Sequence, residues 1–363
     1  MKIGMIFPGQ GSQFVGMAKE FYDKERIVQE YFDEATHCLG LNFVKLCFAS
    51  SENELMETIN AQTSIFLVSA AINRILKEKY NIVPDVVAGH SLGEYSALFA
   101  AGGINFPDAL YLLKKRAEFM ETTTANEFSG MLAVINLSKV RLAEIISKYD
   151  VAGSNEEVLE IVNYNTPTQF VVSGTLKELE KVKNEVKANY GKAIKLKVAG
   201  AFHSRLMKPA QEEFEKYLEK VDFHDIDIPL INNVDAKPLQ KADDLKESLI
   251  RQVSSPILWW DSLLQFKDCD VIIQVGPGTK FSKMILREWP QKQVVSINKP
   301  EDIEELVKLI KPQQEIEKQE NVEKATQETE TETDVISEDE EVKKEEVTTN
   351  SSTPEVESLN DKQ

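Results

Sequence analysis

Ser91 stands between two glycines in the run GHSLG, at residues 89–93. A serine with glycines two positions before and two positions after it suits a strand-to-helix turn that is too tight for larger neighbours. At such a turn the hydroxyl projects outward, and free N–H groups at the start of the next helix point toward an oxyanion. Val86 and Val87 precede the motif, and small and apolar residues follow it. This context favours a serine nucleophile over a serine in an ordinary glycine-rich turn.

A serine hydroxyl needs a neighbouring base to act as a nucleophile, and the chain contains four histidines. His90 adjoins Ser91, and adjacent side chains at a sharp turn point apart, so we expect His90 to line the pocket. His37 lies in a polar helical stretch and His224 in an acidic loop, where solvated histidines are the simpler interpretation. His203, in VAGAFHSRLM, follows the end of a predicted strand, where α/β enzymes gather catalytic groups. We therefore predict that His203 is the base.

Arg116 lies on a stretch that we predict to be helical from Pro107, a residue type favoured in the first turn. Met120 follows one turn later on the same face. Because Lys114 and Lys115 directly precede it, Arg116 taken by itself fits a solvated basic cluster as well as a binding site.

The elements that must position these residues follow two patterns, of which the first is an alternation of apolar strands and helices. Residues 3–7 form a short apolar run that ends in PGQGSQ, and 85–89 repeat this arrangement before GHSLG. The runs VIIQVG at 271–276 and VVSIN at 294–298 resume it, and a final helix ends near Lys311. Alternating strands and helices predict an α/β protein with a mostly parallel sheet covered on both faces.

The second pattern occupies residues 131–198. The predicted order is strand, helix, strand, strand, helix, strand, at 131–135, 138–149, 159–163, 169–173, 176–190 and 193–198. This order is that of a ferredoxin-like unit. In the last strand Ile194, Leu196 and Val198 alternate with lysines, which predicts one buried and one wet face. We therefore expect a catalytic domain of residues 1–127 and 199–311, interrupted by a ferredoxin-like domain at 128–198.

The net charge of −18 is concentrated at the C-terminal end of the sequence. Residues 312–363 hold 17 Asp and Glu against 5 Lys and Arg, and no Phe, Trp or Tyr. Too little apolar surface is available there to offset the entropy of ordering, so we predict a disordered acidic tail. Residues 1–311 are only mildly acidic, with 43 acidic and 37 basic side chains.

Cysteine usage and hydropathy point to a cytoplasmic protein without membrane contact. Cys38, Cys47 and Cys269 are widely spaced, which fits neither a disulfide framework nor a zinc site. The N-terminal run is short and is broken by Gly4 and Pro8, so no signal peptide is expected. No segment approaches the roughly 20 apolar residues of a membrane span.

Two other classes of ligand have little support in the sequence. PGQGSQ suggests a dinucleotide-binding loop, but Gly9 and Gly11 are followed by Phe14 where GxGxxG requires its third glycine. We therefore expect no nicotinamide cofactor and no metal, and we assign no cofactor of any kind. Basic stripes with interleaved aromatic residues are lacking, so we expect no nucleic-acid partner.

Several segments together resemble the malonyl-CoA:acyl carrier protein transacylase family. They are FPGQGSQ (7–13), GHSLGEYSAL (89–98), Arg116 with Met120, NYNTPTQFVVSG (163–174), GAFHS (200–204), NNVDAKP (232–238), RQVSSPILW (251–259) and VGPG (275–278). The resemblance covers the chain from its first residues to about Lys311. It implies an α/β-hydrolase-like large domain with a ferredoxin-like insert, and malonyl-CoA and acyl carrier protein as partners.

The resemblance also implies roles for individual residues. Ser91 corresponds to the acyl-accepting nucleophile, and His203 to the base that activates it and later protonates the leaving thiolate. The backbone N–H groups of Gln10 and Leu92 correspond to the oxyanion hole. A backbone carbonyl at Gln252 corresponds to the group that orients the imidazole, which makes a catalytic acid unnecessary.

The substrate-binding roles follow from the same resemblance. Arg116, with Met120 beside it, corresponds to the residue that pairs with the free carboxylate of the malonyl group, for which its planar fork is suited. Phe202 corresponds to an aromatic residue that crowds the space of a 2-methyl branch, which favours malonyl over methylmalonyl. His90 is expected to line the pocket.

Three other functions stay open at this point. An α/β-hydrolase-like esterase or thioesterase would use the same turn, but it would want an acidic residue in a recognisable motif between Ser91 and His203. A binding protein on an inactive enzyme fold would be expected to have lost Ser91, His203 or Arg116. A stand-alone acyltransferase for polyketide synthesis cannot be separated by sequence from one that supplies fatty-acid synthesis.

Overall fold

The computed structural model describes residues 1–124, 128–151, 153–154 and 157–310. Residues Met1–Ile310 form one compact unit. The predicted tail at 312–363 lies outside the described residues. None of the helices in the described ranges is long and apolar enough to span a membrane.

A six-stranded, mostly parallel sheet is built around the first strand, Ile3–Phe7 (β1). Its two neighbours, Val86–Gly89 (β2) and Val271–Val275 (β9), run parallel to it and are buried along their whole length. Continuous apolar runs of this kind are typical of parallel strands that are covered on both faces. At one edge Gln293–Ile297 (β10) runs parallel to β9. On the other side Leu230–Ile231 (β7) runs parallel to β2, and Pro238–Leu239 (β8) pairs antiparallel with β7 at the second edge. The parallel sheet predicted from the sequence is confirmed.

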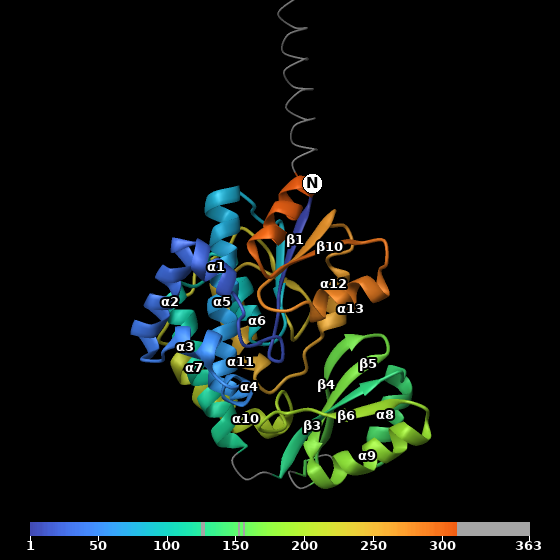
Figure 1. Ribbon diagram of the computed structural model, residues 1–363. Helices are drawn as coiled ribbons and strands as arrows, with labels where there is room; N and C mark the ends of the chain where they lie inside the picture. The colour runs from blue at the N-terminus through green and yellow to red at the C-terminus, as the bar shows by residue number, and fades with distance from the viewer. Residues whose placement is uncertain (125–127, 152, 155–156, 311–363) are drawn as a thin grey trace, which may run out of the picture. The chain divides into compact units, whose positions relative to one another are not determined.

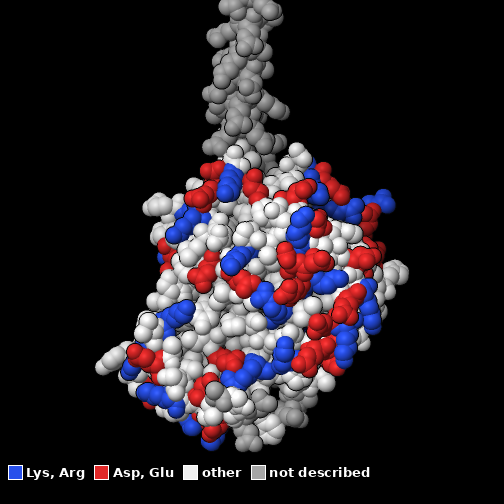
Figure 2. Space-filling view, turned by 180° about the vertical axis from the view of Figure 1, so that it is seen from behind, with Lys and Arg blue, Asp and Glu red and all other residues white. Residues whose placement is uncertain are grey.

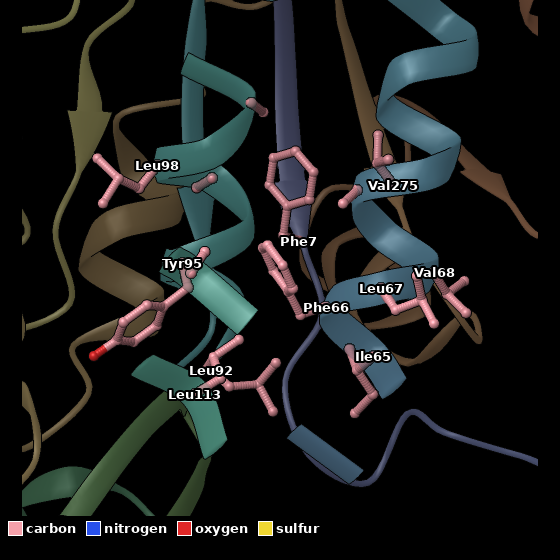
Figure 3. Close-up of a cluster of buried hydrophobic side chains, with 14 of the residues drawn as sticks. Phe7, Ile65, Phe66, Leu67, Val68, Leu92, Tyr95, Leu98, Leu113 and Val275 are labelled. Atoms are coloured by element: carbon pink, nitrogen blue, oxygen red, sulfur yellow. The ribbon is translucent and has the colours of Figure 1, made fainter. Parts of the chain in front are cut away.

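One face of this sheet is covered by the larger group of helices, most of them from the N-terminal half (Figure 1). Figure 3 shows Phe7 of β1 and Phe66 of the central helix lying next to each other in this core. The helices on this side are Lys19–Lys24 (α1), Arg26–Leu39 (α2), Phe43–Ala49 (α3), Glu52–Met56 (α4), Thr58–Tyr80 (α5), Gly93–Ala101 (α6), Phe106–Thr123 (α7), Lys208–Leu218 (α10) and Ala242–Gln252 (α11). The helix predicted to begin at Pro107 begins one residue earlier, where Asn105 caps it by accepting from the backbone N–H of Asp108.

The opposite face is covered by Trp259–Leu264 (α12) and Lys280–Glu288 (α13). Ile6 of β1 belongs to this second core, whereas its neighbours Met5 and Phe7 belong to the first, as the alternation of side chains along a strand requires. Residues 300–310 form the last described helix. The sheet is therefore covered on both faces, as predicted.

A second, antiparallel sheet has the order β4-β5-β3-β6. Its elements follow the strand–helix order predicted for 131–198. They are Ser129–Ile135 (β3), Lys139–Ile146 (α8), Leu159–Thr166 (β4), Gln169–Thr175 (β5), Leu176–Ala188 (α9) and Lys192–Lys195 (β6). The two helices pack on one face of the sheet around a core of their own.

The prediction for the last strand of this sheet was wrong in two respects. β6 ends at Lys195 instead of residue 198, and Ile194 is 41% exposed instead of buried. In the described part of the chain β6 pairs with β3 alone, at the edge of the sheet, and it is Ala193, on the opposite face of the strand from Ile194, that packs against the small core. Leu196 and Val198 come after the strand and line the pocket described below.

A short backbone pairing joins the small sheet to the segment before α12. The N–H of Tyr164 in β4 donates to the carbonyl of Ile257 at 3.0 Å, and the N–H of Ile257 donates to the carbonyl of Val162 at 2.8 Å. This pairing fixes Asn163 and Asn165 of β4 beside the nucleophile turn. Arg205, just before α10, adds ion pairs to Asp150 and Glu160. The small sheet is thus held against the large one on one side of the pocket.

The charged side chains of the body are mixed. Lys and Arg lie among Asp and Glu over the face seen in Figure 2, and neither sign forms a broad continuous stripe there. This distribution agrees with the small excess of acidic over basic residues in 1–311.

Candidate active site

The strand–turn–helix expected around GHSLG is present: β2 ends at Gly89, and α6 begins at Gly93. A Cβ on Gly89 would lie 1.9 Å from the backbone of Gly93, and a Cβ on Gly93 would lie 2.4 Å from the carbonyl oxygen of Phe7. Larger side chains are therefore excluded at both positions. Between them Ser91 has a φ of 55°, in the left-handed region that non-glycine residues adopt at a cost of about 1–3 kcal/mol.

His203 approaches the nucleophile from a turn that follows the small sheet. Its Nε2 lies 2.8 Å from Oγ of Ser91, and its Nδ1 lies 2.9 Å from the backbone carbonyl oxygen of Gln252. A carbonyl only accepts, so Nδ1 donates to it and Nε2 is left free to accept the serine proton. His203 also has a left-handed φ, of 63°. The pair predicted as nucleophile and base is within hydrogen-bonding distance, and the carbonyl predicted to orient the imidazole is in place.

Burial keeps this imidazole neutral. His203 is buried, and its pKa is lowered to about 3, first by burial and then by the positive charge of Arg116. A neutral imidazole is the form that can take up the hydroxyl proton. The other three histidines do not compete for this role: His37 and His224 are exposed, and Nε2 of His90 contacts Asn165 at 3.2 Å.

Arg116 reaches the same serine from α7. Its Nη2 donates to Oγ of Ser91 at 2.9 Å and to Oε1 of Gln252 at 3.0 Å, and its Nη1 donates to Oε1 of Gln62 at 2.7 Å. The side chain is only 1% exposed, and burial lowers its pKa. Among the described residues Arg116 forms no ion pair, and its Nε has no partner. A buried guanidinium of this kind can receive an anionic group.

A cavity of about 250 Å³ lies over these groups. Besides Ser91, His203 and Arg116, it is lined by four of the residues expected from the sequence, Gln10, His90, Met120 and Phe202. Gln62, Asn163 and Lys280 are among its other walls. The cavity therefore brings together side chains from the N-terminal loop, the nucleophile turn, α7 and the turn of the base.

The two backbone amides expected to stabilise an oxyanion belong to Gln10, in the loop after β1, and Leu92, at the start of α6. In the described part of the chain neither N–H donates to a protein acceptor. Gln10 lines the cavity, and Leu92 follows the nucleophile directly. Both positions fit the predicted role, which requires donors near the reacting oxygen.

His90 lies beside the nucleophile and lines the cavity, as predicted. Its pKa is lowered to about 3, because the ring is buried and the ammonium of Lys280 is nearby. Its ring packs edge-on against Trp259, with 5.4 Å between centroids. A neutral histidine held in this way can shape the pocket and offer a hydrogen bond, but it does not contact Oγ of Ser91.

Sequence reasoning missed three polar residues of the site: Gln62, Glu94 and Asn233. All three are buried. Gln62 lies in the first part of α5, next to the polar residues Thr63 and Ser64, so its neighbours in the sequence give no signal that its side chain is buried at the site. Glu94 and Asn233 fall inside segments that carried the family resemblance, but their types alone do not show that they meet each other.

Comparison with known proteins shows which family the chain belongs to. The model of the acyl transferase domain matches residues 5–293. The chain belongs to the acyl transferase family. The resemblance expected from the sequence motifs is thereby confirmed.

Two curated acyl transferase relatives illustrate the match. The malonyl CoA-acyl carrier protein transacylase of Bacillus subtilis is 38% identical over 85% of this chain and 98% of its own length. The polyketide biosynthesis protein ThaF of Burkholderia thailandensis is 37% identical over 79% of this chain, which spans only 24% of that longer protein.

Solved acyl transferase structures agree. The malonyl CoA-acyl carrier protein transacylase from Clostridium perfringens has a TM-score of 0.81 at 33% identity, covering 88% of this chain and 100% of that one. A malonyl-transacylase solved in complex with a type II polyketide acyl-carrier protein has a TM-score of 0.79 at 30% identity, covering 83% and 97%.

Proposed function

We propose that the protein transfers a malonyl group from malonyl-CoA to the phosphopantetheine thiol of acyl carrier protein, through an ester on Ser91. The observation that carries this proposal is the position of Oγ of Ser91, 2.8 Å from a neutral imidazole and 2.9 Å from a buried guanidinium. A base beside the serine supports acyl transfer. A cation that forms no ion pair with the described residues supports an acyl group that carries a carboxylate. The names and coverage of the relatives point in the same direction.

In the first half-reaction, Nε2 of His203 takes the proton of Ser91 while Oγ attacks the thioester carbonyl of malonyl-CoA. The negative charge that develops on the carbonyl oxygen is stabilised by the N–H groups of Gln10 and Leu92. The C–S bond then breaks, and the imidazolium returns its proton to the thiolate of coenzyme A. The malonyl group remains on Ser91 as an ester.

In the second half-reaction, the thiol of the carrier protein loses its proton to His203 and attacks the ester carbonyl. The C–O bond breaks, Ser91 recovers the proton, and the malonyl thioester of the carrier leaves. The carbonyl of Gln252 holds the imidazole in one tautomer throughout, so no catalytic carboxylate is required. This ping-pong scheme uses a Ser-His dyad and needs neither a metal nor a cofactor.

The acyl group is selected by side chains that line the cavity beside the nucleophile. Arg116 exchanges its contact with Ser91 for a contact with the malonyl carboxylate, with Met120 beside it. Phe202, buried and in the cavity wall, occupies space that a branch at the second carbon would need. Malonyl-CoA is thus the proposed donor, ahead of acetyl-CoA and methylmalonyl-CoA.

Supply of fatty-acid synthesis is the pathway that we assign. The curated relative from Bacillus subtilis, which is of similar length, is named a malonyl CoA-acyl carrier protein transacylase, whereas this chain spans only 24% of ThaF. A stand-alone acyltransferase for polyketide synthesis would use the same site, and the carrier protein used in an assay separates the two. An esterase or thioesterase would release malonate to water instead.

We also propose the domain division made from the sequence: an α/β-hydrolase-like domain of residues 1–127 and 199–311, with a ferredoxin-like insert at 128–198. The two separate sheets and the order β4-β5-β3-β6 support it. The cytoplasmic location belongs to the same proposal and rests on cysteines that are free, two of them buried.

The test is a mass measurement on intact protein after brief mixing with malonyl-CoA, followed by location of the adduct. The expected result is one malonyl group on the peptide that contains Ser91, and its transfer to added carrier protein. Accumulation of free malonate without carrier loading would identify a hydrolase. The absence of any adduct on Ser91 would overturn the proposal.

A further inference from the structure

Glu94 is a buried carboxylate that the mechanism above does not use. It lies in α6, three residues after the nucleophile, and is 1% exposed. Its Oε2 accepts two hydrogen bonds, from the backbone N–H of Asn233 at 3.0 Å and from Nε2 of Gln252 at 2.8 Å. Burying an ionisable group is costly, so a carboxylate kept at this place calls for an explanation.

The two partners of Glu94 reach the nucleophile turn from separate segments. Oδ1 of Asn233 accepts from the N–H of Ser91 at 2.7 Å, and Nδ2 of Asn233 donates to the carbonyl of Gly89 at 2.7 Å. Nε2 of Gln252 donates to the carbonyl of Ser91 at 3.1 Å. The side-chain amides of Asn233 and Gln252 therefore hold the backbone of the strained turn. Glu94 accepts from the side-chain amide of Gln252 and from the backbone N–H of Asn233.

Gln252 also connects Glu94 to the base and to the cation. Its backbone carbonyl accepts from Nδ1 of His203, and its Oε1 accepts from Nη2 of Arg116. The amide thus lies between a buried cation and a buried anion, accepting from Arg116 and donating to Glu94. This arrangement fixes which end of the amide points to which residue.

Glu94 is the acidic side chain that balances the charge of Arg116 through this amide. Arg116 has no ion pair among the described residues, and the electrostatic attraction between the two groups favours the charged form of each. Among the described residues, the charged and titratable groups that interact electrostatically with Glu94 are Arg116, Asp235, Arg251 and Tyr95.

We propose that Glu94 is a positioning residue that acts through Gln252 and Asn233, and that its negative charge limits how tightly Arg116 holds the acyl carboxylate. This inference rests on the proposed function. As a positioning residue, Glu94 holds the Ser91 turn, the backbone carbonyl of Gln252 and the guanidinium of Arg116 in their relative positions. As an anion, it makes the potential at Arg116 less positive, which weakens the ground-state hold on malonyl and leaves a neutral acyl group unaffected.

Two substitutions separate these contributions. Glu94→Gln keeps one oxygen acceptor for the N–H of Asn233 and the amide of Gln252, and it removes only the charge. Glu94→Ala removes both. Glu178→Gln is the matched control. Glu178 is also a buried acid in a helix, but its helix is α9, which packs on the small sheet, and it forms an ion pair with Lys181.

The measurement is kcat and KM for acyl transfer from malonyl-CoA and from acetyl-CoA, in the full-length protein. For Glu94→Gln we expect the KM for malonyl-CoA to fall by roughly three- to tenfold, with the KM for acetyl-CoA within about twofold of the parent. For Glu94→Ala we expect kcat to fall at least about tenfold with both donors. Glu178→Gln should change neither parameter.

Two outcomes would overturn the inference. One is a Glu94→Gln variant whose KM changes equally for both donors or for neither. The other is a Glu94→Ala variant that is folded by circular dichroism and keeps the parental kcat. A failure of the proposed function is distinguishable from these, because the parent protein would then form no malonyl ester on Ser91.

Discussion

Nε2 of His203 lies 2.8 Å from Oγ of Ser91, although 112 positions of the chain separate the two residues. Because the hydroxyl is a nucleophile only when its proton can leave, removing either partner should stop the same step. We expect Ser91→Ala to abolish the malonyl adduct in an intact-mass measurement. We expect His203→Ala to form it very slowly. Retention of transfer by Ser91→Ala within about tenfold of the parent, roughly 1.4 kcal/mol of barrier, would contradict the assignment.

Arg116 gives a prediction that separates two acyl groups. Removing the guanidinium leaves an acyl carboxylate unpaired in a partly dry cavity, and a neutral acetyl group makes no such demand. Arg116→Ala should therefore lower kcat/KM for malonyl-CoA by on the order of a hundredfold, about 3 kcal/mol, with little loss for acetyl-CoA. Arg116→Lys should recover only part of the activity, because an ammonium lacks the planar fork. Equal losses for both donors in a folded variant would make Arg116 structural.

The lowered pKa of His203 predicts how the rate of acyl transfer changes as the pH is lowered. The base must be neutral to accept a proton, so a pKa of about 3 keeps it competent far below the ordinary value of 6.5. We expect kcat/KM for acetyl-CoA to stay nearly constant from about pH 8 to about pH 5. Arg116 helps to lower the pKa of His203, so the Arg116→Ala substitution should raise that pKa. As the pH falls, the variant should therefore lose activity at a higher pH than the parent does. A parental acid limb centred at or above 6.5 would show that the imidazole is not held neutral by its surroundings.

Glu94 predicts a dependence of stability on pH. Its pKa is raised to about 7 from an ordinary 4.5, chiefly by burial. A group with a raised pKa contributes its full stability below the ordinary value and loses it as pH rises through the raised value. Glu94→Gln does not titrate, so its free energy of unfolding relative to the parent should increase by on the order of 2 kcal/mol between pH 4.5 and pH 8. Denaturant unfolding at both pH values checks this, with Glu178→Gln as control; a constant difference would refute it.

The C-terminal region predicts tolerance to truncation. The compact unit ends at Ile310, and residues 312–363 contain no aromatic side chain that could join a core. A chain that ends at Lys311 is expected to fold and to transfer malonyl at the parental rate. Circular dichroism and a carrier-loading assay measure these two properties. Insoluble or unfolded protein after truncation would contradict the expectation.

The buried strands and the catalytic pair could be predicted from the sequence, because each leaves a local signal. β1 was predicted at its observed bounds, since the short apolar run from Ile3 to Phe7 is bracketed by Lys2 and by Pro8. Ser91 was found from its flanking glycines, and the exposure of His37 and His224 agrees with the elimination that selected His203.

The polar network under the site could not be predicted, because it depends on segments that meet only in the folded chain. Glu94 and Gln252 are 158 positions apart, and their hydrogen bond leaves no trace in the spacing of either residue. Ile194 was wrongly expected to be buried because alternation indicates two different faces of a strand and does not say whether another layer covers one of them. Whether a strand lies at an edge is a property of the whole sheet.

The backbone pairing between β4 and Ile257 has a consequence for engineering. Exchange of residues 128–198 with a relative would transplant one half of this pairing and leave the other half behind. The pairing holds Asn163 and Asn165 beside His90. A mismatched pairing would therefore disturb the pocket before it disturbed the fold of the insert. A chimera that changes acyl preference therefore needs the segment around Ile257 to be transferred together with the insert, although the two are remote in the gene.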